Sequence, residues 1–134
     1  MNDKVREITE GLQHFNGTEI FYQIPLTRTR FTDGLKYLAN VAGCFWLITD
    51  VSVIAKSLMD KSYFITIDFK RLAEKEKTEL ECEAIITYSD GNDNIFESHR
   101  YSFTDFPLDK LRLYFVDNTL MLPSEYLQYG ISKL

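Results

Sequence analysis

The sequence lacks the features that mark several large classes of protein. It has three prolines, two cysteines and six glycines among 134 residues, so neither a low-complexity disordered chain nor a disulfide-stapled scaffold fits it. No window approaches the roughly 18 consecutive apolar residues of a membrane helix, and the N-terminus has no apolar run typical of an export signal. We expect a soluble, cytoplasmic protein with Cys44 and Cys82 as reduced core thiols; a disulfide between them is the alternative.

Clusters of basic residues are also missing. The chain carries 15 Lys and Arg against 20 Asp and Glu, a formal net charge of -5. Phosphate-backbone binding depends on clustered cations, so nucleic acid is disfavoured as a partner. The side chains that would bind it are Arg28, Arg30, Lys36 and Arg112. Arg28 and Arg30 form either a local anion site or, as we favour, two solvated side chains.

What is present suits one folded domain. With 45% hydrophobic and 14% aromatic residues, residues 1–134 can bury a sizeable core. Apolar residues recur every three or four positions in three segments, which predicts helices over residues 3–15, 32–42 and 45–59. Thr32 is the expected N-cap of the second helix, and Gly43 is expected to end it.

Alternating apolar and polar residues predict the strands. We expect them at residues 18–24, 62–70, 79–88, 95–101, 110–115 and 119–122, with a charged loop over residues 71–78. Asp117 and Asn118 form a two-residue turn that places Phe115 opposite Leu120. The predicted class is α+β, an antiparallel sheet of about five to six strands with about three helices packed on one face.

A second hairpin is predicted around Asp90–Gly91. With these residues as the turn, Ala84 lies opposite Glu97 and Cys82 lies opposite His99. A turn one residue later changes the register and keeps the same faces. In both registers the hairpin's second strand presents Glu97 and His99 toward the more apolar face.

The same register invites a catalytic hypothesis. Cys82, Glu97 and His99 on one sheet face could be a nucleophile, an orienting group and a base. We favour a structural interpretation, because one strand pair supplies no oxyanion donors. The alternatives are a buried hydrogen-bonded histidine, a bulge that reverses the strand, and a strand end that extends past the helices into solvent. Arg100, on the opposite face, is expected to pair with a glutamate of the neighbouring strand.

The more polar sheet face also carries large apolar residues. Phe64, Ile85 and Phe96 lie there among charged and hydroxyl side chains. Such a face is either ordinary surface or half of a dimer contact, and we favour a homodimer.

Five sequence motifs carry a resemblance to a known family. They are Phe31-Thr32-Asp33-Gly34, Tyr37-Leu38-Ala39, Trp46-Leu47, Phe103-Thr104-Asp105-Phe106-Pro107-Leu108 and Leu120-Met121-Leu122-Pro123-Ser124-Glu125-Tyr126. In combination they resemble a family of small bacterial proteins of unknown function, which also occur on phages and other mobile elements. The resemblance implies one compact domain and no established activity, cofactor or catalytic residue.

The chemistry of the motif residues indicates where a site would form. We expect five of them near any surface cleft: Asp33, Trp46, Asp105, Glu125 and Tyr126. Four of them also have a structural interpretation: Asp33 and Glu125 at helix starts, Asp105 at a chain corner and Trp46 as a core anchor.

Two functions follow from these residues. The favoured hypothesis is a non-enzymatic protein-binding or adaptor protein without metal or cofactor. The alternative is a small metal-dependent hydrolase or nucleotide-handling enzyme that uses Asp33, Asp105 and Glu125.

Overall fold

The computed structural model describes residues 3–15, 20–25, 27–102 and 104–126 of the chain. Its helices are α1 (Asp3–Leu12), α2 (Asp33–Ala42), α3 (Phe45–Ser57) and α4 (Glu74–Leu80). Its strands are β1 (Phe21–Gln23), β2 (Arg30–Thr32), β3 (Phe64–Arg71), β4 (Ala84–Ser89), β5 (Ile95–Tyr101), β6 (Lys110–Val116) and β7 (Thr119–Met121). Residues 123–126 are also helical. None of the helices in the described part of the chain is long and apolar enough to cross a membrane.

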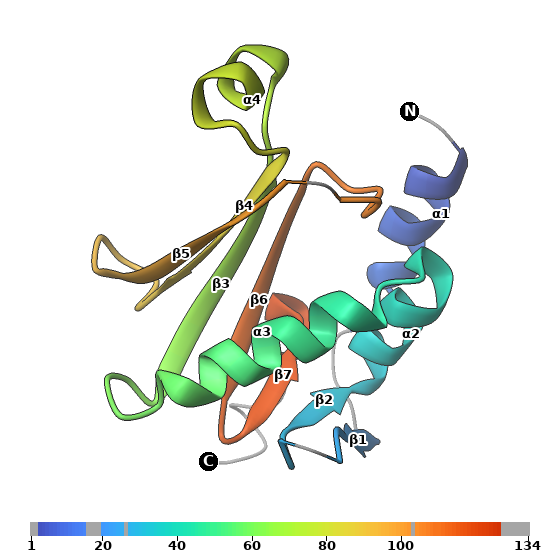
Figure 1. The fold of residues 1–134 in the computed structure, drawn as a ribbon. Helices are drawn as coiled ribbons and strands as arrows, with labels where there is room; N and C mark the ends of the chain where they lie inside the picture. The colour runs from blue at the N-terminus through green and yellow to red at the C-terminus, as the bar shows by residue number, and fades with distance from the viewer. Residues whose placement is uncertain (1–2, 16–19, 26, 103, 127–134) are drawn as a thin grey trace.

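The strands form one sheet in the order β1-β2-β7-β6-β3-β4-β5. Helices α2 and α3 lie across one face of it, and α1 lies beside α2 (Figure 1). Strands β2 and β7 run parallel, whereas the other described pairs are antiparallel. The predicted α+β class is confirmed, but the sheet is mixed rather than antiparallel and has seven strands rather than five to six, and the described residues form more helices than the three predicted. The unpredicted strand, Arg30–Thr32, is too short to show an alternating pattern.

The predicted helices at residues 32–42 and 45–59 are confirmed as α2 and α3. The Thr32 side chain accepts a hydrogen bond from the backbone N–H of Leu35 at 3.4 Å, as an N-cap does. Gly43 ends α2 with φ 63°, a left-handed conformation that glycine adopts without steric cost.

The hydrophobic core lies between these two helices and the sheet. Its sheet side comes from the inward residues Ile65, Ile67, Phe69, Ala84, Ile86, Leu113 and Phe115. Its helix side comes from Leu35, Leu38, Leu47, Ile48 and Val51. The β6–β7 turn is also as predicted, with positive φ at Asp117 and Asn118 and with Phe115 opposite Leu120.

The segment between β3 and β4 differs from its prediction. Of residues 71–78, expected as a loop, Arg71 ends β3 and residues 74–78 belong to α4, and the strand predicted from residue 79 begins only at Ala84. Helix α4 projects beyond the end of the sheet (Figure 1) and buries none of its residues. It therefore lacks the apolar stripe from which a helix is predicted. Ion pairing on its surface, such as Lys77 Nζ to Glu74 Oε1 at 3.3 Å, replaces that stripe.

The register of the β4–β5 hairpin is also corrected. Ala84 lies opposite Tyr101 rather than Glu97, a shift of four residues, and His99 lies opposite Ile86 rather than Cys82. The shift arises because the loop spans residues 90–94, closed by a hydrogen bond from Asp90 N to Asn94 O at 3.1 Å. The predicted parity survives the shift, because Glu97 still lies opposite a core residue of β4.

Two predictions for the more polar sheet face are wrong. Arg100 lies opposite Ile85 and donates to the carbonyl of Leu80 at 3.3 Å, not to a glutamate. Phe96 packs against the core, because the strand pairing is irregular beside it, between Tyr88 and Ser89.

Candidate functional site

The structure distributes the five predicted site residues over two places. Asp33, Glu125 and Tyr126 lie where the end of the described chain meets the start of α2. Trp46 and Asp105 line a surface cleft near the start of α3. The two places differ in what their acidic groups contact.

The first place is a joint built around Glu125, whose exposed fraction is only 1%. One carboxylate oxygen accepts from the Thr32 hydroxyl at 2.6 Å and from the N–H of Leu122 at 3.0 Å. The other accepts from the N–H of Gly34 at 3.2 Å. We call these four residues the Glu125 joint.

The joint satisfies backbone donors that helix starts leave unpaired. Gly34 lies in the first turn of α2, where N–H groups have no partner within the helix. Glu125 also reaches back to Leu122, as a glutamate in the first turn of a helix does in a capping box. A Cβ on Gly34 would lie 2.7 Å from Leu122 Cδ1 and 2.9 Å from Glu125 Cδ, so any other residue would force these two buried side chains to shift.

Burial raises the pKa of Glu125, and the nearby Asp33 carboxylate adds to that rise. The hydrogen bonds from Thr32, Leu122 and Gly34 act in the opposite direction. Asp33 itself accepts a long hydrogen bond of 3.5 Å from the Tyr22 hydroxyl. The Glu125 carboxylate is thus occupied by the protein's own donors, which makes the joint a structural element.

Tyr126 packs beside the joint. Its ring lies 5.0 Å from that of Phe64 and 5.5 Å from that of Tyr114, with both pairs close to perpendicular. This cluster covers part of the sheet face that is turned away from α2 and α3. Tyr126 therefore contributes packing to that face and lies outside the cleft.

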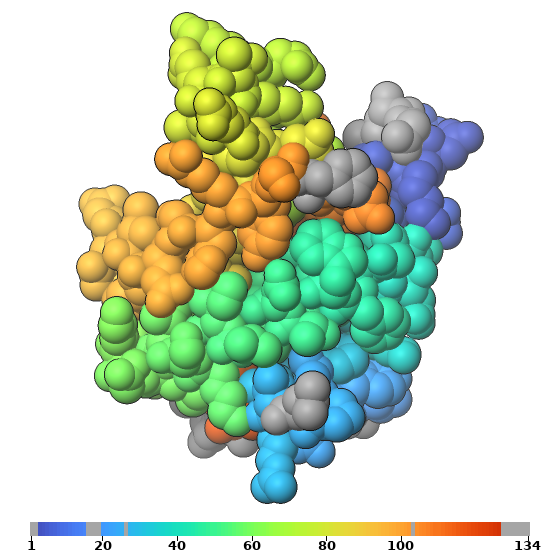
Figure 2. All heavy atoms as spheres, viewed as in Figure 1, coloured from blue at the N-terminus to red at the C-terminus, as the bar shows by residue number. Residues whose placement is uncertain are grey.

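The second place is a cleft of about 330 Å³ between α3, the end of β5 and the segment that follows it. We call it the acidic cleft; it is lined by Trp46, Asp50, Tyr101, Thr104 and Asp105. Trp46 and Asp50 are four residues apart on α3, so their side chains share one face of the helix. In Figure 2 the orange residues of β5 lie directly against the green surface of α3.

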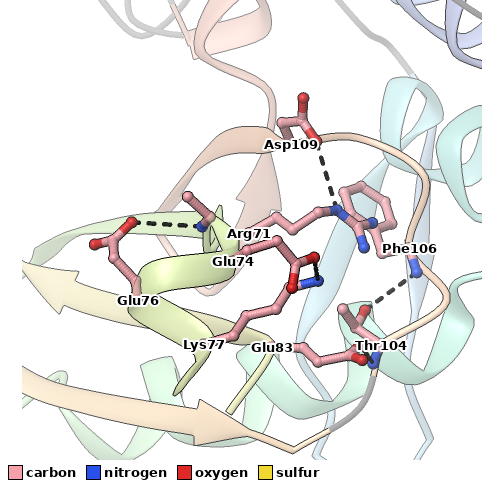
Figure 3. Close-up of polar contacts among 9 residues, drawn as sticks. Arg71, Glu74, Glu76, Lys77, Glu83, Thr104, Phe106 and Asp109 are labelled. Atoms are coloured by element: carbon pink, nitrogen blue, oxygen red, sulfur yellow. Dashed lines mark hydrogen bonds and ion pairs between the residues drawn. The ribbon is translucent and has the colours of Figure 1, made fainter. Parts of the chain in front are cut away.

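The segment that carries Asp105 is held by polar contacts on both sides (Figure 3). The Glu83 carboxylate accepts from the N–H of Thr104 at 3.1 Å, and the Thr104 hydroxyl accepts from the N–H of Phe106 at 3.1 Å. Farther on, Arg71 forms an ion pair of 3.5 Å with Asp109. The exposed Asp105 is thus fixed between two residues whose backbone positions are set.

Aromatic rings form the walls of the acidic cleft. The rings of Trp46 and Tyr101 lie 6.2 Å apart at an angle of 53°. The Tyr101 hydroxyl donates a hydrogen bond of 3.4 Å to Asp50. Two carboxylates therefore flank a pair of rings.

Three neighbouring groups report the negative potential of the cleft. Burial, the Asp50 charge and the hydrogen bond to Asp50 raise the pKa of Tyr101 to about 12. Burial and then the Asp105 charge raise the pKa of Cys44 to about 12. Burial raises the pKa of Tyr88 as well, with smaller contributions from Tyr101, Asp50 and Glu97. In each case a nearby acid opposes the formation of a further negative charge.

The metal-site hypothesis requires Asp33, Asp105 and Glu125 to converge, and they do not. Asp33 begins α2, whereas Asp105 lies close enough to Cys44, just after α2, to raise its pKa. The ten residues of α2 separate the two ends by about 15 Å. Among the described residues, no group of three His, Cys, Asp or Glu side chains could hold a metal ion.

The catalytic hypothesis for Cys82, Glu97 and His99 also fails on geometry. Glu97 and His99 meet, with Oε2 and Nε2 2.8 Å apart, but His99 lies opposite Ile86. Cys82 is buried four residues before Ile86, where the strand has not yet begun.

Three of the four basic residues proposed for nucleic acid have partners within the chain. Arg112 is bound to Asp68 through two hydrogen bonds of 2.7 and 3.2 Å. Arg30 lies over the ring of Phe21, and Lys36 lies over the ring of Phe45, each at 5.0 Å. Lys36 also lies over the ring of Tyr22 at 5.4 Å, so aromatic rings of the chain itself contact both cations.

Comparison with known proteins identifies a family to which the chain is similar. Residues 6–126 match a family of unknown function, DUF6876. The chain belongs to this family. The match covers both the Glu125 joint and the acidic cleft, and it confirms the predicted membership of a family without an established activity. No curated protein and no solved structure matches the chain.

Two lining residues of the cleft in this DUF6876 chain were not predicted. Asp50 lies on the exposed side of α3 and Tyr101 at the end of β5, and neither belongs to a local motif. Asp50 does follow Trp46 by one helical turn, so the predicted helix and the predicted Trp46 site together could have indicated it. Tyr101 required the strand register, which the sequence alone did not fix.

Proposed function

We propose that this protein is a non-enzymatic binding module that holds a cationic side chain of a partner protein in the acidic cleft. The observation that carries the proposal is the arrangement of Asp50 and Asp105 around the rings of Trp46 and Tyr101. Aromatic faces and carboxylates both attract cations. A cleft that combines them selects a positive group and repels a negative one.

The size of the cleft favours the end of a side chain over a large ligand. Its volume of about 330 Å³ is near the lower end of ligand sites, which are about 300–1,000 Å³. An arginine guanidinium suits it best, because this planar cation stacks on rings and bonds carboxylates through two N–H groups. A lysine ammonium would make the same charge contacts with less stacking.

A binding role also fits the chemistry of the cleft. Its acids are both exposed, and the cysteine beside it has a raised pKa, which disfavours the nucleophilic thiolate. The enzymatic alternative would need Asp33 and Glu125 near Asp105. We therefore rank it second.

The intrinsic fluorescence of Trp46 provides a direct test, because it is the only tryptophan of the chain and lines the cleft. We expect N-acetyl-arginine amide to change this fluorescence with a Kd of about 1 mM. N-acetyl-citrulline amide, which has a similar shape without the charge, should bind at least tenfold more weakly.

Variants test whether the arginine probe binds in the acidic cleft. Asp50→Asn and Asp105→Asn should each weaken arginine binding several-fold, whereas Asp93→Asn, the same change in the exposed loop after β4, should not. Equal responses to the arginine and citrulline probes, or an unchanged affinity in both cleft variants, would refute the proposal.

We further propose a setting for this binding. The resemblance to proteins of bacteria, phages and mobile elements supports a host protein as the partner and the cytoplasm as the location.

A further inference from the structure

Strand β5 ends the sheet and offers an open edge. In the part of the chain that the structure describes, it pairs only with β4. It is seven residues long, and it lies at the outside of the sheet in Figure 1. An edge of this length presents unpaired backbone groups that another strand can join.

The backbone geometry shows which residues face that edge. The Tyr101 carbonyl accepts from the N–H of Glu83 at 2.8 Å, so the backbone of Tyr101 faces β4. Hydrogen-bonding groups alternate between the two sides of an antiparallel strand, so His99 also faces β4. Ser98 and Arg100 therefore direct their N–H and C=O groups to the open edge, and both residues are exposed.

A second copy of the same strand could join this edge in more than one register. An antiparallel pair centred on His99 would place two imidazoles together, and one centred on Arg100 would place two guanidinium groups together. A pair centred on Ser98 instead places Glu97 opposite the partner's His99 and His99 opposite the partner's Glu97. The Ser98 register is favoured, because a carboxylate and an imidazole can share a hydrogen bond across the strands, whereas the other two registers bring identical side chains together.

Glu97 and His99 each keep one polar atom free for contacts in that register. Within one chain, the contact of 2.8 Å between Glu97 and His99 uses one carboxylate oxygen and one ring nitrogen. The second oxygen and the second nitrogen can meet the partner's pair. Residues at such positions have Cβ atoms about 5 Å apart, close enough for this contact.

We propose that β5 pairs with β5 of a second copy of this chain, antiparallel and centred on Ser98, so that two sheets become one. Glu97 and His99 of each chain form a cluster with their counterparts across the two-fold axis. This dimer does not depend on ligand binding in the acidic cleft.

A cysteine trap tests both the contact and its register. In Ser98→Cys, two thiols face each other at the two-fold axis, and an added oxidant should link them into a disulfide dimer on a non-reducing gel. In Arg100→Cys, the control on the same edge, the two cysteines are offset by about 13 Å along the strands, beyond the roughly 7 Å that a disulfide can bridge. The natural Cys44 and Cys82 are buried and should leave the wild type unlinked.

Light scattering tests the pairing of Glu97 with His99 between the two copies without a cross-link. The wild type should have twice the 15.7 kDa mass of one chain. Glu97→Lys should shift it to the single-chain mass, and the exchange Glu97→His with His99→Glu should restore the dimer. Glu79→Lys, the same change of charge on α4, should remain dimeric.

Some outcomes would overturn the proposal. These are a single-chain mass for the wild type at submillimolar concentration, equal cross-linking of the two cysteine variants, or an exchange variant that is folded by circular dichroism and stays monomeric.

Discussion

The Glu125 joint and the acidic cleft contain the same kinds of side chain and use them differently. In the joint, Glu125 is 1% exposed and accepts hydrogen bonds from three donors of its own chain. In the cleft, Asp105 is exposed, and its neighbours Thr104 and Phe106 are held without its carboxylate. An acid is available to a ligand only where the fold has not already supplied its donors.

The electrostatic effects differ in the same way. Burial raises the pKa of the Glu125 carboxyl itself. In the cleft the acids act on other groups, since Asp50 raises the pKa of Tyr101 and Asp105 raises that of Cys44. Substitutions in the joint should therefore change stability, and substitutions in the cleft should change the properties of its neighbours.

The largest effect is expected from Glu125→Ala. It removes the acceptor of three buried donors, on Thr32, Gly34 and Leu122. Leaving such groups unpaired should lower the free energy of unfolding by about 3 to 4 kcal/mol. Urea denaturation measures this loss, with the exposed Glu79→Ala as the control. A loss equal to that of the control would mean that the joint contributes no stability.

A smaller loss is expected from Gly34→Ala. The added Cβ would meet Leu122 and Glu125 at less than 3.0 Å, and such overpacking costs about 2 kcal/mol. Gly43→Ala is the informative comparison, because nothing lies within 4 Å of its Cβ and only its φ of 63° opposes the change. It should cost about 1 kcal/mol. Thermal unfolding would rank the two, and a reversed order would contradict tight packing at the joint.

The pH dependence of the joint should be weaker still. The raised pKa of Glu125 means that the folded state binds this proton more readily than the unfolded state. Its contribution is therefore fully present below the unfolded value of about 4.3 and is lost as pH rises through the folded pKa. Relative to Glu125→Gln, which cannot titrate, the wild type should gain stability as the pH falls from 7 toward the unfolded value of about 4.3, as urea titrations would measure. If the wild type instead loses stability relative to Glu125→Gln as the pH falls, the predicted direction of the pH dependence is wrong.

The smallest change in stability is expected in the cleft. Asp50→Asn should alter the free energy of unfolding by less than about 0.5 kcal/mol, because the side chain is exposed. The pKa of Tyr101 should nevertheless fall below about 12, while burial, its largest cause, keeps it above the ordinary value. NMR of ring-labelled tyrosine measures it, with Asp93→Asn as the control. An unchanged pKa would mean that Asp50 does not contribute to the raised pKa of Tyr101.

The sequence predicted what local patterns determine. Thr32 and Gly43 marked the ends of α2, and Asp117–Asn118 marked the turn that set the β6–β7 register. Helix α4 was missed because it buries no residue, and β2 because three residues carry no period. Strand β2 depends on β7, a partner distant in the chain.

The site residues show the same limit. Trp46 and Asp105 were each singled out from their motifs, but their meeting depends on how the segment after β5 folds back onto α3. The hairpin register placed Tyr101 beside them, and it changed because the loop after β4 extends to Asn94. Nothing local to Glu125 indicated that Gly34 would be its partner.

The Glu125 joint also bears on the order of events during synthesis. Thr32 and Glu125 are 93 positions apart, so the capped start of α2 leaves the ribosome long before its partner exists. At about 5–20 residues per second, this delay is roughly 5 to 20 s. The pairing of β2 with β7, its parallel neighbour, is delayed by a similar time. A nascent chain stalled before residue 119 should therefore expose the apolar side of α2 to chaperones, and release of the last segment should close the domain.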